Sequence, residues 1–209
     1  VPRIFEKIHA KILDSVASMT GVKRKLADWS IAVGLQTVPY RQKSQDLPFM
    51  LGLKYKIADK LVLNKFRAAL GGKVRACSSG GSALSKEVGS FFCGIGITII
   101  EGYGLTETSP VMTVGHSDFF KFGTVGKAIP GVEVKIQPDG EIVCRGHNVM
   151  MGYYKNEEAT NEAIIDGWFH SGDIGEFDED GLLRITDRKK SLIVTSGGKN
   201  VAPQPMEVS

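Results

Sequence analysis

The stretch from Ile97 to Pro110 reads Ile-Thr-Ile-Ile-Glu-Gly-Tyr-Gly-Leu-Thr-Glu-Thr-Ser-Pro, and the predicted fold is organised around it. Its first four residues, 97–100, are a β-branched run that predicts a buried strand. Gly102 and Gly104 then stand on either side of Tyr103. Glycines let a backbone approach a flat ligand closely, and an aromatic ring between them offers a face for stacking. The sequence therefore indicates a site for a flat ligand where this strand ends.

The polar end of the same stretch places the Thr106 hydroxyl next to the Glu107 carboxylate. Such a pair suits a phosphate oxygen and a hard cation such as Mg²⁺. The alternative is a strand that runs into an ordinary polar turn, which is what a lone Gly-x-Gly would favour. Tyr-Gly-Leu-Thr-Glu-Thr behind a strand is more specific than that, so we predict a phosphate and magnesium site.

A second glycine turn comes earlier in the chain. Residues 73–77 predict a strand, and Ser85 begins a helix that runs to about Cys93. Strand, glycine turn and helix are how α/β proteins present backbone amides to nucleotides at the carboxyl ends of strands. No Gly-Lys-Ser/Thr follows, so this is not a Walker loop, and an ordinary tight turn remains the alternative. The turn contains Gly80, Gly81 and Ser82.

A third candidate segment contains Asp173, which follows a glycine. A short acidic side chain there can accept both hydroxyls of a ribose, although an isolated Gly-Asp can also be a simple turn. Arg188 opens the basic run 188–190, where a guanidinium suits a ribose or phosphate oxygen better than an ammonium does. A solvated charge run is the alternative there. His170 has no partner at metal-ligand spacing, which favours a hydrogen-bonded or surface histidine over a zinc ligand.

Hydrophobic spacing and turn residues predict the remaining elements. We expect helices in the first third of the chain, then a β-α-β unit, then a region of hairpins with one short helix. The helices are expected at Pro2–Ser18, Lys25–Val38, 49–70 and Glu157–Ile164; the paired strands at Val132–Ile136 with Glu141–Cys144 and Ile174–Phe177 with Leu183–Ile185; and a last strand at Ser191–Thr195.

Composition sets the limits of the prediction. A chain of 209 residues that is 42% hydrophobic can bury a core, and no apolar run is long enough to span a bilayer. Three cysteines without C-x-x-C spacing are expected to be buried free thiols in a reducing compartment. Residues 1–75 hold 15 Lys/Arg and 5 Asp/Glu, which indicates either an anionic partner or a solvated basic face. No aromatic-and-basic interleaving argues for nucleic acid.

The segments quoted above resemble the AMP-forming acyl-CoA synthetases (the adenylate-forming ligases), and their order along the chain is that of the family. Residues 101–108 are similar to the adenine-and-magnesium motif, and the opening Val-Pro-Arg-Ile-Phe-Glu-Lys is typical of the long-chain fatty-acid branch. The resemblance implies an α/β fold in which 1–187 is part of the large AMP-binding domain. Within it, 1–72 would be mainly helical, 73–122 the β-α-β unit and 123–187 β-rich. Residues 188–209 would be the hinge and the start of a truncated C-terminal domain, which makes the chain an internal fragment of a longer enzyme.

The resemblance also implies roles for the candidate residues. Glu107 would hold Mg²⁺, directly or through water, and Thr106 would touch the α-phosphate. Tyr103, between Gly102 and Gly104, would stack on adenine, with the glycine turn lying along the base. Asp173 and Arg188 would hold the ribose, and Lys190 would occupy the hinge between the domains. The adenine-side turn comprises Gly80, Gly81 and Ser82.

The implied reaction is ATP-dependent activation of a long-chain fatty acid to acyl-AMP, followed by transfer to CoA. ATP, Mg²⁺ and CoA are the expected cofactors and co-substrates, and the fragment alone is expected to be inactive. Three alternatives stay open: transfer of the acyl group to a carrier protein, a non-catalytic nucleotide-binding module, and a plain interaction domain. We expect a cytoplasmic protein, with peripheral membrane contact through the basic first half as a further option.

Overall fold

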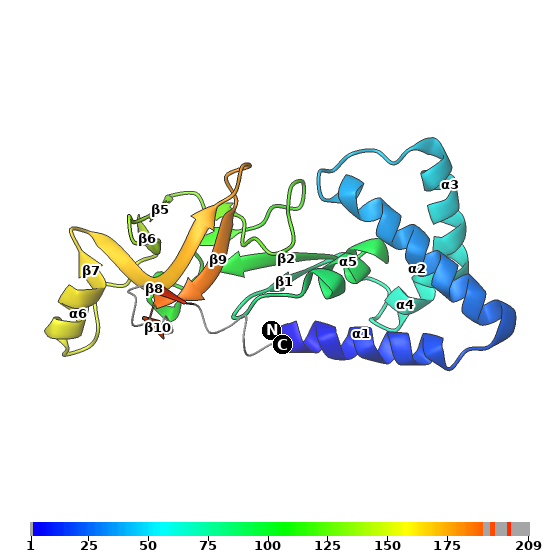
Figure 1. Cartoon of the computed structure of the whole chain (residues 1–209), viewed down its shortest axis with the longest axis horizontal. Helices are drawn as coiled ribbons and strands as arrows, with labels where there is room; N and C mark the ends of the chain where they lie inside the picture. The colour runs from blue at the N-terminus through cyan, green and yellow to red at the C-terminus, as the bar shows by residue number, and fades with distance from the viewer. Residues whose placement is uncertain (1, 190–192, 195–199, 202–209) are drawn as a thin grey trace. The chain divides into compact units, whose positions relative to one another are not determined.

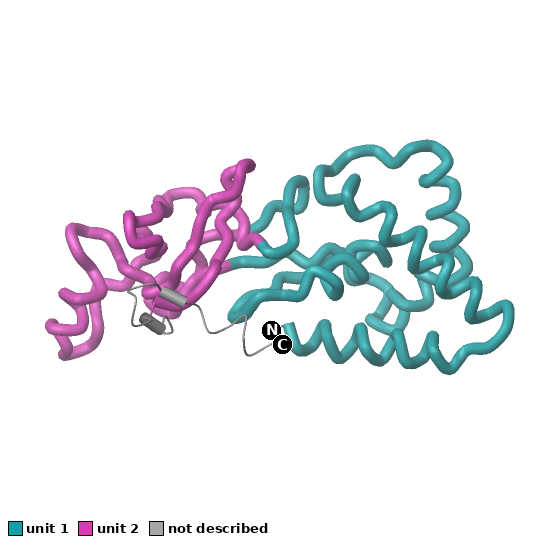
Figure 2. Tube along the Cα trace, in the orientation of Figure 1, with its two compact units in different colours: residues 1–102, 115–123 teal, residues 103–114, 124–209 magenta. Residues whose placement is uncertain are grey.

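A computed structural model describes residues 2–189, 193–194 and 200–201 of the chain. The fold is α/β and divides into two compact units (Figures 1 and 2). The first unit comprises residues 1–102 and 115–123, and the second comprises residues 103–114 and 124–209. Among the described residues, no helix is both long enough and apolar enough to cross a membrane.

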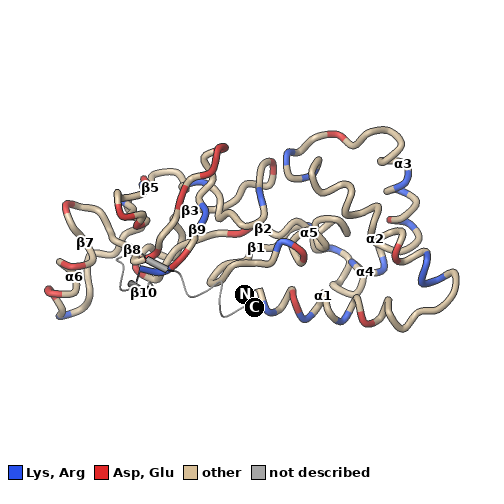
Figure 3. The backbone as a smooth tube through the Cα atoms, in the orientation of Figure 1, with Lys and Arg blue, Asp and Glu red and all other residues tan. Residues whose placement is uncertain are grey.

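The first unit packs helices against a pair of parallel strands. Its apolar core includes Phe92, Ile97 and Ile99, each at most 1% exposed. Lys and Arg are spread along its helices (Figure 3). Its elements are α1 (Pro2–Ala17), α2 (Gly21–Arg41), α3 (Phe49–Ala58), the π-helical turn η1 (Asp59–Leu63), α4 (Asn64–Ala68), β1 (Ala76–Ser79), α5 (Lys86–Gly94) and β2 (Thr98–Tyr103), whose last residue belongs to the second unit.

Helix α2 is longer than predicted and buries only part of its predicted apolar side. Of the apolar residues along the predicted helix 25–38, Val33 is buried, whereas the side chains of Trp29 and Leu35 are 37% and 41% exposed. The buried face consists mainly of small residues, and a Cβ at Gly34 would lie 2.8 Å from the Gly94 carbonyl oxygen. Because α2 approaches α5 so closely there, small side chains take the place of large apolar ones on the buried face. The buried residues of α2 are Ala27, Ser30, Val33, Gly34, Thr37 and Val38.

Both strands of the first unit depart from the predicted bounds. Strand β1 begins at Ala76, later than the predicted residue 73, because its residues pair in parallel with Thr98–Glu101. Strand β2 does not end at residue 100 but continues through Tyr103. The glycines fail to end it because the chain returns alongside: Met112 N–H donates to the Tyr103 carbonyl at 2.8 Å. Tyr103 is therefore the last residue of a strand and not part of a loop.

The second unit is built on a five-stranded antiparallel sheet. Its order is β5-β6-β8-β7, with β9 paired to β8, and β3 pairs with β4 outside this five-stranded sheet. Both predicted hairpins and the helix capped by Asn156 are confirmed; the Asn156 side chain accepts from Ala159 N–H at 3.1 Å. Its elements are η2 (Thr106–Thr108), β3 (Thr113–Val114), β4 (Lys127–Ala128), β5 (Val132–Ile136), β6 (Glu141–Gly146), α6 (Glu157–Ala163), β7 (Ile164–Ile165), β8 (Trp168–Phe177), β9 (Leu183–Arg188), β10 (Ile193–Val194) and β11 (Asn200–Val201).

The end of the chain is described only in part. Strands β10 and β11 pair antiparallel through residues 193–194 and 200–201. Lys190, predicted at the hinge, lies outside the described residues, as do most residues of the predicted strand 191–195 and of the loop after it. The proposed boundary between residues 187 and 188 therefore stays a prediction.

Candidate functional site

The turn after β2 is closed by its own backbone and one buried side chain. A Cβ added at Gly104 would overlap the carbonyl oxygen of Pro110, so no other residue fits that position without moving the turn. Thr108 is fully buried, and its Oγ1 accepts from Leu105 N–H at 2.9 Å. Ser109 completes the turn with a left-handed φ of 55°. Gly104 thus has a steric reason to be glycine, whatever ligand the turn binds.

This turn presents the two residues predicted to hold a phosphate and Mg²⁺. Thr106 is exposed and Glu107 is half-buried in the 3₁₀ turn η2. The Tyr153 hydroxyl donates to Glu107 Oε1 at 2.9 Å, and this hydrogen bond raises the pKa of Tyr153. A hydroxyl beside a carboxylate matches Mg²⁺, which commonly takes one or two protein carboxylates together with water and substrate phosphates. The donor set therefore fits the predicted ion.

A second cluster of the same unit contains three predicted nucleotide contacts. Asp173 on β8 and Arg188 on β9 are direct cross-strand partners, with Arg188 Nε 3.3 Å from Asp173 Oδ1. The Tyr103 hydroxyl donates to Asp173 Oδ2 at 2.6 Å. Burial, reinforced by the negative charge of Asp173, raises the pKa of Tyr103 well above its usual range. The structure thus joins the predicted stacking residue directly to Asp173 and, only through Asp173, to Arg188.

The hydrogen bond between Tyr103 and Asp173 was not foreseen from the sequence. Tyr103 is 9% exposed and packs with Met112 and Phe169 in the apolar core of its unit. Asp173 is 6% exposed, and each of its carboxylate oxygens already has one partner. A carboxylate has about four lone-pair positions, so Asp173 can still accept from another hydroxyl. The Tyr103 hydroxyl therefore helps to hold the Asp173 carboxylate, which is separate from the predicted stacking of the Tyr103 ring on adenine.

The glycine turn predicted along adenine belongs to the first unit. Gly81 has a φ of 85°, and Ser82 is exposed. The turn is held by Glu101, whose Oε1 accepts from Leu84 N–H at 3.0 Å. Burial raises the pKa of Glu101, although its backbone hydrogen bonds from Leu84 and Gly123 oppose the shift. Glu101 stands inside the quoted motif, yet nothing in its local sequence showed that it would fix the other turn.

The candidate residues are thus divided between the units. In the second unit, Asp173 contacts both Tyr103 and Arg188, and Glu107 is hydrogen-bonded to Tyr153. Lys190 lies outside the described residues. The second unit holds Tyr103, Gly104, Thr106, Glu107, Asp173 and Arg188, and the first holds Gly80, Gly81, Ser82 and Gly102.

A buried carboxylate ties Lys189 to the β5–β6 hairpin. Lys189 Nζ lies 2.9 Å from Glu141 Oε2 and 2.8 Å from Asp139 Oδ2. His170 Nδ1 lies 3.0 Å from Glu141 Oε2, so this histidine is hydrogen-bonded. Burial alone would raise the pKa of Glu141, but the hydrogen bonds from His170 and Lys189 outweigh it and lower that pKa. The two carboxylates raise the pKa of Lys189 in turn.

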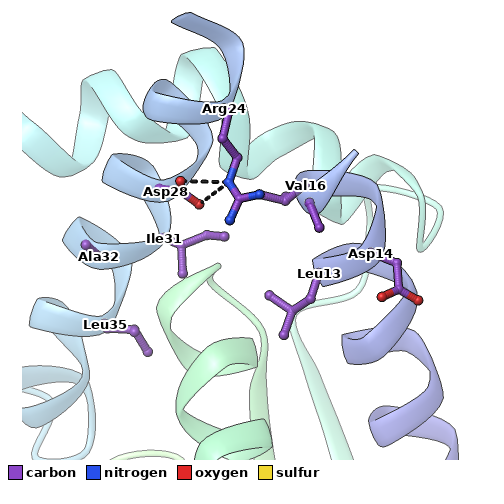
Figure 4. Close-up of a pocket in the computed structure, with 9 residues that line it drawn as sticks. Leu13, Asp14, Val16, Arg24, Asp28, Ile31, Ala32 and Leu35 are labelled. Atoms are coloured by element: carbon purple, nitrogen blue, oxygen red, sulfur yellow. Dashed lines mark hydrogen bonds and ion pairs between the residues drawn. The ribbon is translucent and has the colours of Figure 1, made fainter. Parts of the chain in front are cut away.

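The first unit also has a shallow hollow of about 420 Å³ between α1 and α2 (Figure 4). The Arg24–Asp28 ion pair, 2.7 Å long, lies at its edge. The lining is mostly apolar. Besides Arg24 and Asp28, the hollow is lined by Leu13, Asp14, Val16, Ala17, Ile31, Ala32 and Leu35.

The described residues include no group of three or more His, Cys, Asp or Glu side chains arranged to hold a metal ion. All three cysteines are free. Cys93 and Cys144 are buried, and burial raises the pKa of each thiol to about 11. Cys77 is partly exposed.

The chain matches a protein family described as "AMP-binding enzyme" over residues 1–154. The long-chain-fatty-acid–CoA ligase FadD15 of Mycobacterium bovis is 46% identical over 99% of this chain and 34% of its own length. The long-chain-fatty-acid–CoA ligase ACSBG2 of Xenopus laevis is 41% identical, again over 99% of this chain and over 29% of its own. The chain thus spans about a third of the length of these curated relatives.

Among solved structures, the fold is similar to the O-succinylbenzoate coenzyme A synthetase MenE of Bacillus subtilis in complex with ATP and magnesium ion. The TM-score is 0.58 and the sequences are 30% identical, over 69% of this chain and 34% of that one. The fold and the sequence therefore agree in their similarity to this group of proteins.

Proposed function

The chain belongs to the AMP-binding enzyme family, and on this premise we propose that it carries the nucleotide-binding part of a long-chain fatty-acid–CoA ligase. In the proposed reaction the fatty-acid carboxylate attacks the α-phosphorus of ATP, and pyrophosphate leaves. The CoA thiol then attacks the acyl carbon of the acyl-adenylate, and AMP leaves. The chain spans about a third of the length of its relatives. The reaction is therefore proposed for the native polypeptide that contains this chain, here called the full-length polypeptide.

The observation that carries the proposal is the Thr106–Glu107 pair on its closed turn. The pair lies in the same unit as the hydrogen-bonded group of Tyr103, Asp173 and Arg188. A magnesium phosphate group and a ribose are parts of one nucleotide, so two such groups within one unit support a single nucleotide site. The ATP and magnesium named for the similar MenE structure support the same ligands here.

Each residue then has a proposed role in binding and orientation. Glu107 would hold Mg²⁺, directly or through water, and the ion neutralises charge on phosphate oxygens when bound. Thr106 is exposed, so its hydroxyl can reach the α-phosphate. Asp173 would accept from the ribose hydroxyls while Tyr103 and Arg188 keep its carboxylate in place. This assignment needs no covalent protein nucleophile, because catalysis would come from positioning and charge stabilisation.

The adenine side and the domain boundary complete the proposal. Residues 80–82 and Gly102 would line the base, with the ring of Tyr103 against it. The helices of residues 1–72 would wall the acyl chain, and residues 188–209, with Lys190, would form the hinge to the next domain. The 209-residue chain alone is proposed to form no acyl-CoA.

The test uses fatty-acid-dependent exchange of pyrophosphate into ATP and thioester formation by the full-length polypeptide. The proposal expects both activities, with CoA as acceptor. Exchange without a CoA thioester, but with acylation of a phosphopantetheine carrier protein, would favour the carrier-protein alternative. ATP binding without any exchange would favour a non-catalytic nucleotide module and would overturn the proposed reaction.

A further inference from the structure

Residues 148–153, here called the brace, hold the turn of residues 104–111 at several points. The Asn148 side-chain amide donates to the carbonyl of Thr108 at 3.1 Å and to that of Val111 at 2.9 Å. Met150 N–H donates to the Glu107 carbonyl at 2.7 Å. These bonds join segments about 40 residues apart in the sequence, all within the second unit. The backbone of the Thr106–Glu107 turn is thus fixed by a distant segment.

The brace also fixes the side chain of Glu107. The Tyr153 hydroxyl donates to Glu107 Oε1, whereas no ion pair to Glu107 occurs among the described residues. A phenol occupies one lone pair of the carboxylate without neutralising its charge, which an arginine or lysine would do. The hydrogen bond from Tyr153 therefore sets the orientation of the Glu107 carboxylate and leaves lone pairs for a ligand.

Tyr153 is itself anchored at the start of α6. Its backbone N–H donates to Thr160 Oγ1 at 2.9 Å, and that hydroxyl donates to the Asn156 carbonyl at 2.7 Å. Asn156 caps the same helix. Gly152 allows this packing, because a Cβ there would lie 2.8 Å from the Thr160 methyl carbon. Helix α6 thus fixes the position of Tyr153, and Tyr153 in turn fixes the orientation of the Glu107 carboxylate.

The exposure of Tyr153 argues against a role in the core. The residue is 39% exposed and is absent from the apolar cluster of its unit. Its polar contact with Glu107 is therefore the interaction that replacement by phenylalanine removes. A tyrosine that only stabilised the fold would be expected to bury its ring.

We propose that Tyr153 is a positioning residue for the magnesium site, which holds the Glu107 carboxylate in the orientation that binds the ion. The inference rests on the proposed function, since it takes Glu107 as the ligand. Outer-shell partners of metal ligands typically contribute 10–100-fold to metal affinity. Loss of the Tyr153 hydroxyl should therefore act on metal affinity first and on nucleotide chemistry through it.

The experiment compares Tyr153→Phe with Tyr154→Phe in the full-length polypeptide. Tyr154 is the adjacent tyrosine, 88% exposed, and serves as the matched control. Binding of Mn²⁺, used as a paramagnetic probe in the presence of ATP, is measured by electron paramagnetic resonance. Exchange of pyrophosphate into ATP is then followed against Mg²⁺ concentration, and thermal unfolding is recorded for each variant.

The expected result is a 10–100-fold weaker Mn²⁺ affinity for Tyr153→Phe, with an unchanged melting temperature and exchange that recovers at high Mg²⁺. Tyr154→Phe should match the wild type. Unchanged Mn²⁺ affinity would overturn the proposal. A variant that unfolds, or whose exchange falls without recovery by Mg²⁺, would show a structural role and overturn it as well.

A Glu107→Gln variant separates this inference from the proposed function. If Glu107→Gln loses Mn²⁺ binding but Tyr153→Phe does not, only the role of Tyr153 fails. If Glu107→Gln itself keeps wild-type Mn²⁺ affinity, the assignment of Glu107 as ligand fails, and the role of Tyr153 fails with it.

Discussion

Replacing Tyr103 by phenylalanine removes one hydroxyl and keeps the ring, so it separates the two roles assigned to this residue. Stacking on a base needs only the ring. Support of Asp173 needs the hydroxyl, which donates to Asp173 Oδ2 at 2.6 Å. Both residues are buried, at 9% and 6% exposure, so solvent cannot readily replace the lost donor.

The size of the effect follows from what remains around Asp173. A hydrogen bond to a charged group contributes about 1.5–3 kcal/mol. The other partner, Arg188, lies 3.3 Å away with a side chain that is 70% exposed, and such a screened pair contributes at most about 1 kcal/mol. Arg188 therefore cannot compensate, and we expect the local free energy of unfolding to fall by about 2 kcal/mol. A change of this size multiplies the open fraction by up to about 30-fold.

Hydrogen exchange read by mass spectrometry measures this change in the full-length polypeptide. Peptides from β8 and β9 should exchange faster in Tyr103→Phe than in the wild type, and Tyr154→Phe should leave them unchanged. AMP affinity, measured by calorimetry on the same proteins, should fall in Tyr103→Phe because the Asp173 carboxylate is held less firmly. Unchanged hydrogen exchange in β8 and β9, together with unchanged AMP affinity, would refute the role of the Tyr103 hydroxyl in supporting Asp173. Only the role of the ring would then remain.

Three further outcomes are expected. Gly104→Ala should abolish exchange of pyrophosphate into ATP, because the added Cβ would overlap the Pro110 carbonyl oxygen; wild-type exchange would contradict this. Glu141→Gln should cost about 3 kcal/mol of unfolding free energy at pH 7 and less in acid, measured by urea unfolding. The pKa of Glu141 is lowered in the folded chain, so its contribution is complete above the unfolded pKa of about 4.3 and is lost as pH falls through the native value. If the difference in unfolding free energy between the wild type and Glu141→Gln did not shrink in acid, that result would count against the contribution of the Glu141 contacts with His170 and Lys189. Cys77 should react with a thiol reagent in the native protein and the two buried cysteines only after unfolding; three fast thiols would contradict their burial.

Local chemistry was enough to predict many elements of the fold. Ser85 caps the helix that it was expected to begin, and Asn156 caps the helix predicted from residue 157, each by accepting a backbone N–H. The β5–β6 hairpin follows from strand alternation on both sides of a Pro-Asp-Gly turn. Helix α2 was harder, since its buried face is made of small residues whose burial depends on a close approach to α5. A pattern search for large apolar residues misses such a face.

The candidate site was predicted as residues but not as an arrangement. Tyr103 was expected in a loop because glycines surround it, whereas the returning chain extends β2 to include it. The pairing of Asp173 with Arg188 depends on a register shift between Ile174 and Gly175 that no local signal marks. Tyr153 reaches Glu107 from a segment far along the chain, so its contact requires the folded structure. Sequence spacing identifies residues of suitable chemistry, but tertiary packing determines which of their side chains are in contact.

The most direct test of the account is fatty-acid-dependent exchange of pyrophosphate into ATP by the full-length polypeptide and its Glu107→Gln variant. The substitution keeps the size of the side chain and removes its charge, while the Tyr153 hydroxyl can still donate to the amide oxygen. Losing one preorganised charge stabiliser typically costs 10²–10³ in rate, and we expect a loss of at least that order. The predicted result is measurable pyrophosphate exchange by the wild type and a rate at least about 100-fold lower in Glu107→Gln, with an unchanged melting temperature. Exchange near the wild-type rate in the variant would contradict the placement of the magnesium site on this turn.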